Sequence, residues 1–136
     1  MARVTDLLFA LKADEFEGKG ISVNNLFSAL NPEYVPGLFS FSVVIALLDL
    51  DKCGTHFLSV KFLDPNQEET IKIDKIQLPV DIKQDGNLPN EHCGLHICME
   101  WNNVNFKMSG IYTAVVSYDD EEIYKKEIYV KGKNQP

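Results

Sequence analysis

The fold is decided near the end of the chain, which reads SGIYTAVVSY over residues 109–118, DDEE over residues 119–122 and IYKKEIYV over residues 123–130. Two runs rich in β-branched and aromatic residues, joined by a short polar segment, are typical of a β-hairpin. Gly110 stands two residues before Tyr112 at the start of the first run. This spacing is typical of the penultimate strand of an immunoglobulin-like sandwich, where the tyrosine hydroxyl bonds back to the preceding corner. The end of the chain therefore predicts an all-β protein with a C-terminal β-hairpin.

The rest of the chain divides into short apolar runs separated by turn signals. The expected strands cover about residues 3–13, 21–30, 39–47, 56–63, 69–78 and 92–101, with a helix left open for the first of them. Polar or proline-rich turns come between them, at residues 14–20, 31–37, 49–54 and 64–67. Short strands with turns about every 8 to 12 residues are typical of a sandwich. We expect one domain over residues 1–136, an immunoglobulin-like antiparallel β-sandwich of about seven or eight strands.

The side-chain pattern adds detail to two of these strands. In residues 56–63 the even positions are apolar and should point inward, which places His56 on the apolar face. In residues 69–78 the apolar positions switch from odd to even, which indicates a bulge or a bend near Asp74. We expect residues 79–90 to form an irregular connection, and residues 102–109 to link the strand at 92–101 to the final hairpin.

The composition is acidic and otherwise ordinary. The 136 residues are 45% hydrophobic and 24% charged, with a formal net charge of −7 and a pI near 4.9. This balance argues against general nucleic-acid binding, because affinity for phosphates is dominated by Lys and Arg. The longest apolar run, residues 43–48, is far shorter than the roughly 20 residues that span a bilayer. We therefore expect neither a nucleic-acid partner nor a membrane partner.

The start of the chain does not resemble a signal peptide. Asp6 interrupts the first apolar stretch, and a small-residue cleavage site is lacking. The cysteines are Cys53, Cys93 and Cys98, an odd number that favours reduced thiols in the absence of a secretion signal. We expect a cytoplasmic protein whose cysteines are packing residues.

The densest group of reactive side chains lies in HCGLHIC, residues 92–98. On a strand His92, His96 and Cys98 would share one face, and a histidine and a thiolate two residues apart can bind one zinc ion. A structural zinc site needs a fourth ligand, and the remaining histidine, His56, belongs to a different strand. These three residues are the candidate metal ligands, and the competing interpretation is an outward polar face. No cofactor is expected.

A thiol enzyme is a related alternative. It would pair Cys98 with His96, or Cys53 with His56. Neither pair lies in a recognisable nucleophile signature, and such a pair needs a third group that orients the base. The sequence also lacks a phosphate-binding glycine loop, a dinucleotide fingerprint and a nucleophile elbow. These absences favour a protein that is not an enzyme.

The terminal hairpin supplies the candidate protein-binding residues. Its turn is acidic, and an exposed tyrosine on an edge hairpin is a typical protein-contact residue. An acidic turn would act on the rate and specificity of association with a basic partner. The candidate contact residues are Tyr118, Asp119, Asp120, Glu121, Glu122, Tyr124 and Tyr129. Acidic segments elsewhere do not match a calcium-binding loop and are interpreted as solvated turns.

Four segments together resemble a family of small uncharacterised bacterial proteins. They read GKGISV over residues 18–23, FSVVIAL over 41–47, GTHFLSVKFLDPN over 54–66 and SGIY over 109–112. The resemblance implies a compact bacterial or phage-borne β-sandwich with no assigned activity. It transfers no site residues.

These observations lead to three functional hypotheses. The favoured one is a non-enzymatic module that binds another protein, or a second copy of itself as a homodimer, through a sheet edge or a loop end. The second is a metal- or thiol-dependent enzyme centred on His92, His96 and Cys98. The third is an acidic phage or mobile-element inhibitor of a basic host protein.

Overall fold

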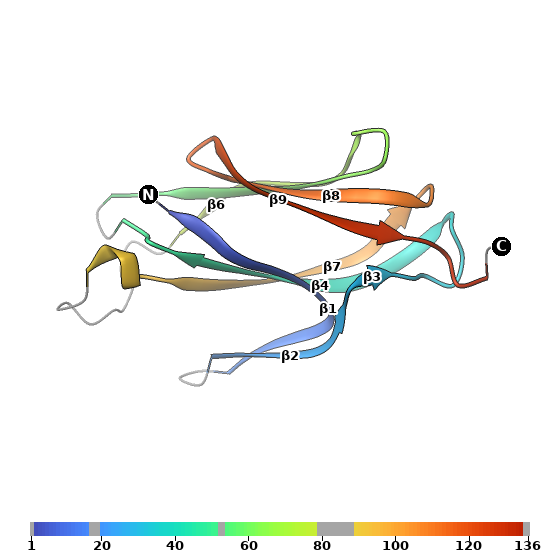
Figure 1. Cartoon of the computed structure of the whole chain (residues 1–136), viewed down its shortest axis with the longest axis horizontal. Coiled ribbons are helices and arrows are strands. Elements are labelled where there is room, and N and C mark those ends of the chain that lie inside the picture. The colour runs from blue at the N-terminus through green and yellow to red at the C-terminus, as the bar shows by residue number, and fades with distance from the viewer. Residues whose placement is uncertain (1, 17–19, 52–53, 79–88, 135–136) are drawn as a thin grey trace.

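The computed structural model describes residues 2–16, 20–51, 54–78 and 89–134, and these residues form a β-sandwich (Figure 1). In chain order the elements are β1 (Arg3–Phe16), β2 (Gly20–Phe27), β3 (Ala29–Leu30), β4 (Gly37–Leu48), β5 (Phe57–Leu63), β6 (Glu69–Gln77), the 3-10 helix η1 (Asn90–His92), β7 (Leu95–Phe106), β8 (Gly110–Tyr118) and β9 (Glu121–Val130). The all-β prediction is confirmed. The first segment, which was compatible with a strand or a helix, is a strand.

The strands divide into two packed sheets. One sheet has the order β2-β1-β4-β7, and the other has the order β3-β9-β8-β5-β6. Neighbouring strands are antiparallel except β3 and β9, which run parallel. In Figure 1 the five-stranded sheet lies above the four-stranded sheet. The turn between β8 and β9 and the loop between β3 and β4 lie at opposite ends of the sandwich (Figure 1).

Aromatic rings from both sheets fill the centre of the core. Phe9 and Phe41 come from the four-stranded sheet and Phe62 from the other, and their ring centroids are 6.0 Å apart in each pair. Leu58, Val60 and Phe62 are fully buried, which confirms the inward even face of β5. Burying one large apolar side chain contributes roughly 1.5 to 3 kcal/mol, so each of these rings makes a sizeable contribution to stability.

The predicted tyrosine corner is present at the start of β8. The Tyr112 hydroxyl donates a hydrogen bond to the Met108 carbonyl oxygen at 2.8 Å, and the Tyr112 side chain is buried. Gly110 has a φ of +141°, and a Cβ at that position would lie 2.7 Å from Pro65 Cγ. Glycine is therefore required here by both backbone conformation and space.

Register shifts occur in several strand pairs. Two of them change which side chains point inward along β6 and β7, and only the first of these two bulges was predicted. The register of β5 and β6 shifts between Leu58 and Val60, opposite residues 73–76, which confirms the bulge near Asp74. Lys75 has a φ of 53° there, and its N–H donates to Ser59 Oγ at 3.2 Å. The extra residue therefore keeps a hydrogen-bond partner on the facing strand.

The second bulge corrects the prediction of a link at residues 102–109. β7 continues to Phe106, and its register with β4 shifts between Phe39 and Phe41. Asn103 has a φ of 53°, and its N–H donates to Ser40 Oγ at 2.9 Å. Residues 102–106 are therefore part of a strand whose inward parity changes after Trp101.

Two other boundaries differ from the sequence prediction, and a third lies mostly outside the described residues. The strand expected at residues 21–30 is two strands, because the chain leaves β2 after Phe27 and joins the other sheet as β3. Asp14 and Glu15 belong to β1 and pair with β2, so the turn expected at residues 14–20 is shorter. The irregular connection expected at 79–90 lies outside the described residues up to 88 and ends in η1.

Candidate functional site

Two segments of the chain meet at one end of the sandwich: the loop between β4 and β5 and the turn between β8 and β9. The loop is anchored by Leu50, whose side chain is buried and whose N–H donates to the Cys93 carbonyl oxygen at 3.1 Å. At the far end of this loop the His56 carbonyl oxygen accepts a hydrogen bond from the Leu78 N–H at 2.9 Å. These backbone contacts fix the positions of Asp51 and His56.

The turn between β8 and β9 contains two residues, Asp119 and Asp120. Their φ angles are 48° and 67°, and Tyr118 pairs with Glu121 across the turn. Positive φ at both central residues is typical of the type I′ turn, whose twist matches that of the flanking strands. Aspartate tolerates this conformation better than most residues with a side chain. The turn therefore presents four consecutive carboxylates at residues 119–122, which we name the acidic turn.

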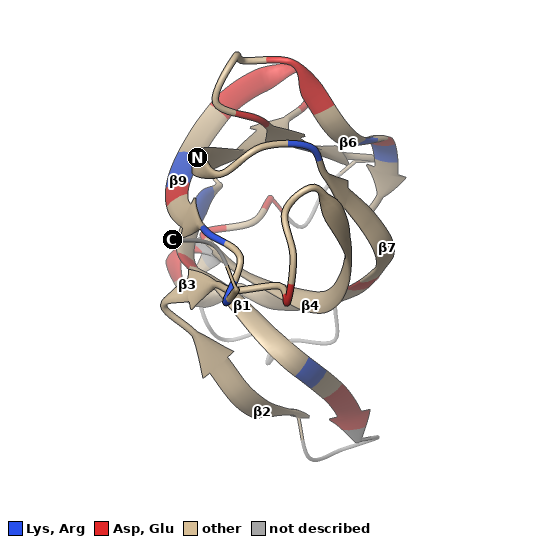
Figure 2. Ribbon diagram, turned by 90° about the vertical axis from the view of Figure 1, so that its right-hand side faces the viewer, with Lys and Arg blue, Asp and Glu red and all other residues tan. Residues whose placement is uncertain are grey.

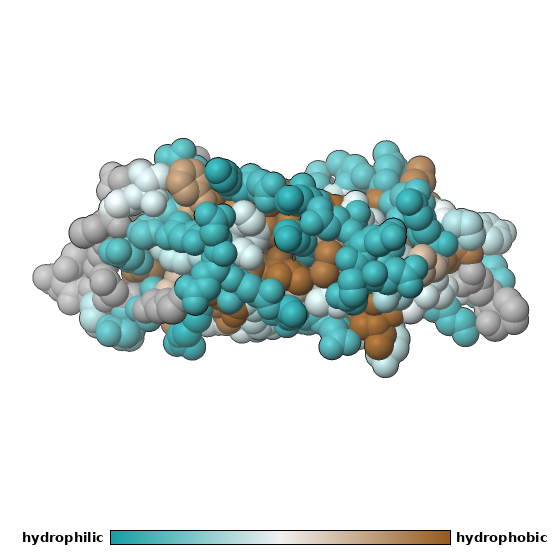
Figure 3. Space-filling view, turned by 90° about the horizontal axis from the view of Figure 1, so that it is seen from above, coloured by the Kyte–Doolittle hydropathy of each residue, from teal (hydrophilic) through white to brown (hydrophobic). Residues whose placement is uncertain are grey.

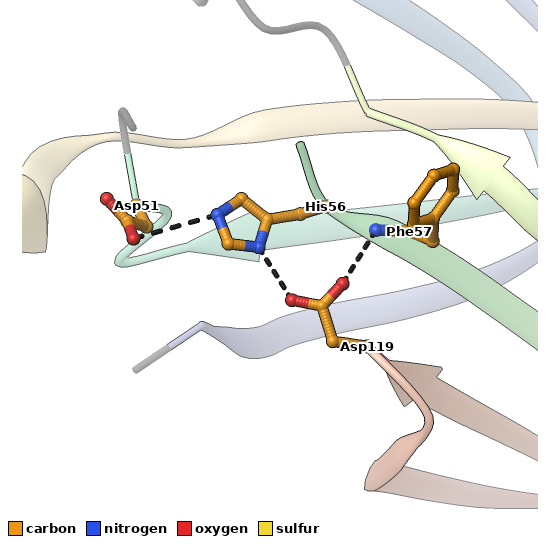
Figure 4. A network of polar contacts seen from close by, with 4 residues as sticks. All are labelled: Asp51, His56, Phe57 and Asp119. Atoms are coloured by element: carbon orange, nitrogen blue, oxygen red, sulfur yellow. Dashed lines mark hydrogen bonds and ion pairs between the residues drawn. The ribbon is translucent and has the colours of Figure 1, made fainter. Parts of the chain in front are cut away.

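His56 connects the loop to the acidic turn (Figure 4). His56 Nδ1 lies 2.6 Å from Asp119 Oδ2, and His56 Nε2 lies 3.6 Å from Asp51 Oδ2. Asp119 Oδ1 accepts a hydrogen bond from the Phe57 N–H at 2.9 Å, and the Asp119 N–H donates to the Phe57 carbonyl oxygen at 2.9 Å. Asp119 therefore uses both carboxylate oxygens to hold the start of β5.

The Tyr118 ring lies against the imidazole of His56. The two ring centroids are 5.2 Å apart and the ring planes differ by 18°, which is a stacked arrangement. His56 is half-buried, with 21% of its side chain exposed, while Asp51 and Asp119 are more exposed. The imidazole is thus fixed by a ring on one face and by carboxylates facing both nitrogens.

The charges around this network change two pKa values in opposite directions. Desolvation acts to raise the pKa of Asp119, but hydrogen bonds from His56 and Phe57 together with the charge of His56 lower it overall. The pKa of Tyr118 is raised to about 12, by burial first and then by the negative charges of Asp119 and Asp51. At neutral pH Asp119 is therefore ionised, and the Tyr118 hydroxyl keeps its proton.

An open cleft of about 450 Å³ lies beside the network. Four of the side chains around it are carboxylic acids. In Figure 2 the broadest acidic segment lies at the top, on the side of the five-stranded sheet, and a smaller one lies at the end of β1. The cleft is lined by Ala2, Asp49, Asp51, His56, Tyr118, Asp119 and Glu121. Its lining is therefore acidic, with one imidazole and one phenol.

The structure separates the candidate protein-binding residues into three groups. Asp119, Asp120, Glu121 and Glu122 are all exposed. Tyr129 is 67% exposed, and Tyr124 is half-buried. Tyr118 is only 8% exposed, so it is the most buried of the three candidate tyrosines. The parity argument required at least one outward tyrosine in the hairpin, and Tyr129 is that residue.

The candidate metal ligands do not form one strand face. His92 lies in η1, before β7 begins at Leu95, so its placement on the strand with His96 and Cys98 is wrong. Among the described residues, no group of three or more His, Cys, Asp or Glu side chains could hold a metal ion. His96 and Cys98 remain on one face of β7, paired with Ala46 and Val44 of β4.

The surroundings of Cys98 disfavour a nucleophilic role. Burial, followed by the charges of Glu15 and Asp14, raises the pKa of the Cys98 thiol. A raised pKa keeps the thiol protonated, and the thiolate is the reactive form. Cys93 is buried, as expected for a packing residue, and Cys53 lies outside the described residues.

Sequence reasoning missed the pairing of His56 with Asp119, which are 63 residues apart. It considered His56 only as an apolar-face residue or as a partner of Cys53, and it treated Asp51 as a turn residue. One signal was available. A histidine at an inward position of a strand end requires a hydrogen-bond partner, and the acidic turn of the predicted hairpin was one candidate for it.

Comparison with known proteins places these features in a family. The model of a family described as Family of unknown function (DUF6941) matches residues 6–131. The chain belongs to this family. No curated protein matches the sequence. The family result confirms the resemblance to uncharacterised proteins and assigns no activity.

Two solved structures share the fold. An immunoglobulin-like protein from Pseudomonas aeruginosa is 11% identical with a TM-score of 0.51, and the match covers 96% of this chain and 97% of that one. The alkylpurine DNA glycosylase AlkC of Pseudomonas fluorescens, bound to DNA containing an abasic site analog, is 8% identical with a TM-score of 0.54. That match covers 96% of this chain, which spans only 30% of the length of the glycosylase. Identities this low show the fold alone, which is the predicted immunoglobulin-like β-sandwich.

The described part of the chain has no helix that is long and apolar enough to cross a membrane.

Proposed function

We propose that the protein is a non-enzymatic module that binds a basic region of another protein through its acidic turn. The observation that carries the proposal is the fixed position of exposed carboxylates. Asp120, Glu121 and Glu122 are exposed, and the preceding Asp119 is held by His56 and by the Phe57 N–H. A loop that is ordered before binding loses less conformational entropy when a partner docks.

The contacts of His56 support a structural role in place of catalysis. A histidine that acts as a general base uses one nitrogen for an orienting group and the other for the nucleophile. Here Nδ1 faces Asp119 and Nε2 faces Asp51, so both nitrogens face carboxylates. The imidazole is therefore suited to holding two loops together.

Charge favours a basic partner over a second copy of this chain. The chain has a net charge of −7, and a symmetric contact through the acidic turn would place like charges opposite one another. The outer surface of the five-stranded sheet is mostly hydrophilic, with a small hydrophobic patch near its middle (Figure 3). Recognition would thus rest on electrostatic complementarity, which increases association rates and depends on salt.

The test compares two double variants that change the net charge equally. Asp120→Lys with Glu122→Lys reverses charge in the acidic turn, and Glu33→Lys with Glu100→Lys reverses exposed residues outside it. Each variant is used to capture proteins from a lysate of the source organism, and the captured protein is purified and titrated at several salt concentrations. We expect the first variant to lose capture and the second to keep it. Equal capture by both variants would contradict the proposal.

A further inference from the structure

We infer that the cleft beside the acidic turn receives one cationic side chain, arginine or lysine, from the protein partner. This inference rests on the proposed function and adds a specific pocket to it. Asp119 and Glu121 of the acidic turn line the cleft, whereas Asp120 and Glu122, which we name the tip of the turn, do not. Charge reversal at the tip and neutral substitutions in the cleft therefore test different statements.

The first observation is the state of the Tyr118 hydroxyl. Only 8% of Tyr118 is exposed, yet within the described residues its hydroxyl has no hydrogen-bond partner. The only enclosed side-chain polar atom without a partner in that part of the chain is Trp101 Nε1. The Tyr118 hydroxyl is therefore not enclosed, and the open space that this residue lines is the cleft. A buried ring whose hydroxyl is open to a cleft is held in a fixed position in which a ligand can replace water as its hydrogen-bond partner.

The second observation is the charge around that hydroxyl. Asp119 and Asp51 are close enough to contribute to the raised pKa of Tyr118, and Glu121 lies on the same cleft. A ligand that contacts these groups gains most if it is positively charged. The Tyr118 hydroxyl can accept a hydrogen bond from such a ligand through its oxygen lone pairs.

The spacing of the carboxylates distinguishes an organic cation from a metal ion. A calcium ion needs several oxygens within roughly 2.3 to 2.6 Å of one point. Among the described residues no group of three acidic, histidine or cysteine side chains meets that requirement. A guanidinium carries five N–H donors and an ammonium three, and these donors reach separate acceptors at hydrogen-bond distance. The volume of about 450 Å³ lies at the small end of ligand pockets and is suited to one side chain.

Four of the cleft residues then have a defined role. The Tyr118 hydroxyl accepts one hydrogen bond from the cation, and the exposed Glu121 carboxylate accepts another. Asp119 contributes its charge while its oxygens remain bonded to His56 and the Phe57 N–H. His56 positions Asp119 and stacks on Tyr118, so it is a positioning residue.

The test is a titration of ¹⁵N-labelled full-length protein with small probes, followed by ¹H–¹⁵N correlation spectra. The probes are N-acetyl-arginine methylamide, N-acetyl-lysine methylamide and the neutral N-acetyl-glutamine methylamide. We expect saturable shifts of the Phe57, Asp119 and Glu121 amide signals with at least one cationic probe and none with the neutral probe. Comparing the two cationic probes identifies the preferred side chain.

Two variants locate the site. Tyr118→Phe keeps the buried ring, and Glu121→Gln keeps the size of an exposed side chain, so neither is expected to disturb folding. Each removes one hydrogen-bonding partner and should weaken binding of the cationic probe by about 2- to 12-fold. Glu122→Gln, on the neighbouring residue outside the cleft, is the control and should weaken it less than about 2-fold.

Three outcomes would overturn the inference. The first is that neither cationic probe gives saturable shifts, and the second is that the neutral probe gives equal shifts. The third is that Tyr118→Phe and Glu121→Gln leave the binding of the cationic probe unchanged. The proposed function fails separately, if reversing Asp120 and Glu122 leaves partner capture intact. Partner capture can also be measured with Tyr118→Phe and Glu121→Gln. If capture is lost on reversal of Asp120 and Glu122 but is unchanged in these two variants, the proposed function holds and the inference about the cleft is wrong.

Discussion

Two tyrosines on the inner face of β8, Tyr112 and Tyr118, lie in similar positions and have different surroundings. Both are buried, and both pack against other rings. The Tyr112 hydroxyl donates to the Met108 carbonyl oxygen, whereas the Tyr118 hydroxyl has no partner within the described residues. The end of the sandwich at Tyr112 uses its polar groups to close a corner. The end at Tyr118 leaves acceptors open to a cleft.

The neighbouring residues continue this difference. Around Tyr112 the rings are apolar, with Phe62 at 5.4 Å and Phe106 at 5.1 Å between centroids. Around Tyr118 they are replaced by His56 and by the carboxylates of Asp51 and Asp119. A tyrosine hydroxyl that is open to a cleft and lies beside charged groups is available to accept a hydrogen bond from a ligand.

The largest expected effect concerns Phe62, the central core ring that packs against Tyr112. Phe62→Ala should destabilise the protein by about 3 to 5 kcal/mol, because it removes a fully buried ring between the two sheets. Urea unfolding measures the change. Phe57→Ala on the same strand is the matched control, since that ring is partly exposed, and it should cost less than about 1.5 kcal/mol. Similar losses at both positions would mean that the core is not concentrated where we place it.

The next effect is that of the corner hydrogen bond. Tyr112→Phe keeps the ring and removes only the hydroxyl that donates to Met108, so the expected loss is about 1 kcal/mol in urea unfolding. Tyr129→Phe, on an exposed ring, is the control and should leave the free energy of unfolding unchanged. A Tyr112→Phe variant as stable as the control would show that the corner bond contributes nothing net.

The difference between local patterns and contacts between distant segments explains which parts of the fold could be predicted. The inward face of β5 and the tyrosine corner follow from local patterns, because alternation and the Gly110-x-Tyr112 spacing act within one strand. The parity change at Asp74 was recognised because isoleucines stand on both sides of it. The equivalent change after Trp101 was not, because two asparagines occupy the bulge and made the rest of β7 resemble a loop.

The candidate site was harder to predict because it depends on contacts between distant segments. The acidic turn was identified, and its exposure agrees with the sequence pattern. The pairing of Asp119 with His56 requires that β5 and β8 be neighbours, and local periodicity contains no such information. The short segment β3 was missed for the same reason, since its place beside β9 is set by the sandwich as a whole.

A smaller effect is the pH dependence of stability at the end of the sandwich that contains Tyr118 and Asp119. The pKa of Asp119 is lowered in the folded protein from an ordinary value of 3.8, so its contribution to stability is present above about pH 4 and is lost as pH falls through the lower folded pKa. Asp119→Asn keeps a residue that tolerates positive φ and should cost about 0.5 kcal/mol at pH 7, since the pair is partly exposed. Urea unfolding between pH 7 and pH 2.5 should show the difference from wild type shrinking below pH 4. A difference that stays constant over that range would contradict the lowered pKa.

The smallest expected effect tests the comparison between the tyrosines most directly. Tyr118→Phe removes a hydroxyl that bonds to no described residue, so the free energy of unfolding should change by less than about 0.5 kcal/mol, against about 1 kcal/mol for Tyr112→Phe. Both substitutions remove the same atom from the same face of the same strand, and only the partner differs. An equal loss at both positions would mean that the Tyr118 hydroxyl already has a structural partner, and the cleft would then lose the acceptor on which its affinity for a cation depends. A neutral Tyr118→Phe that nevertheless weakens binding of the cationic probe would show that this hydroxyl serves recognition and not folding.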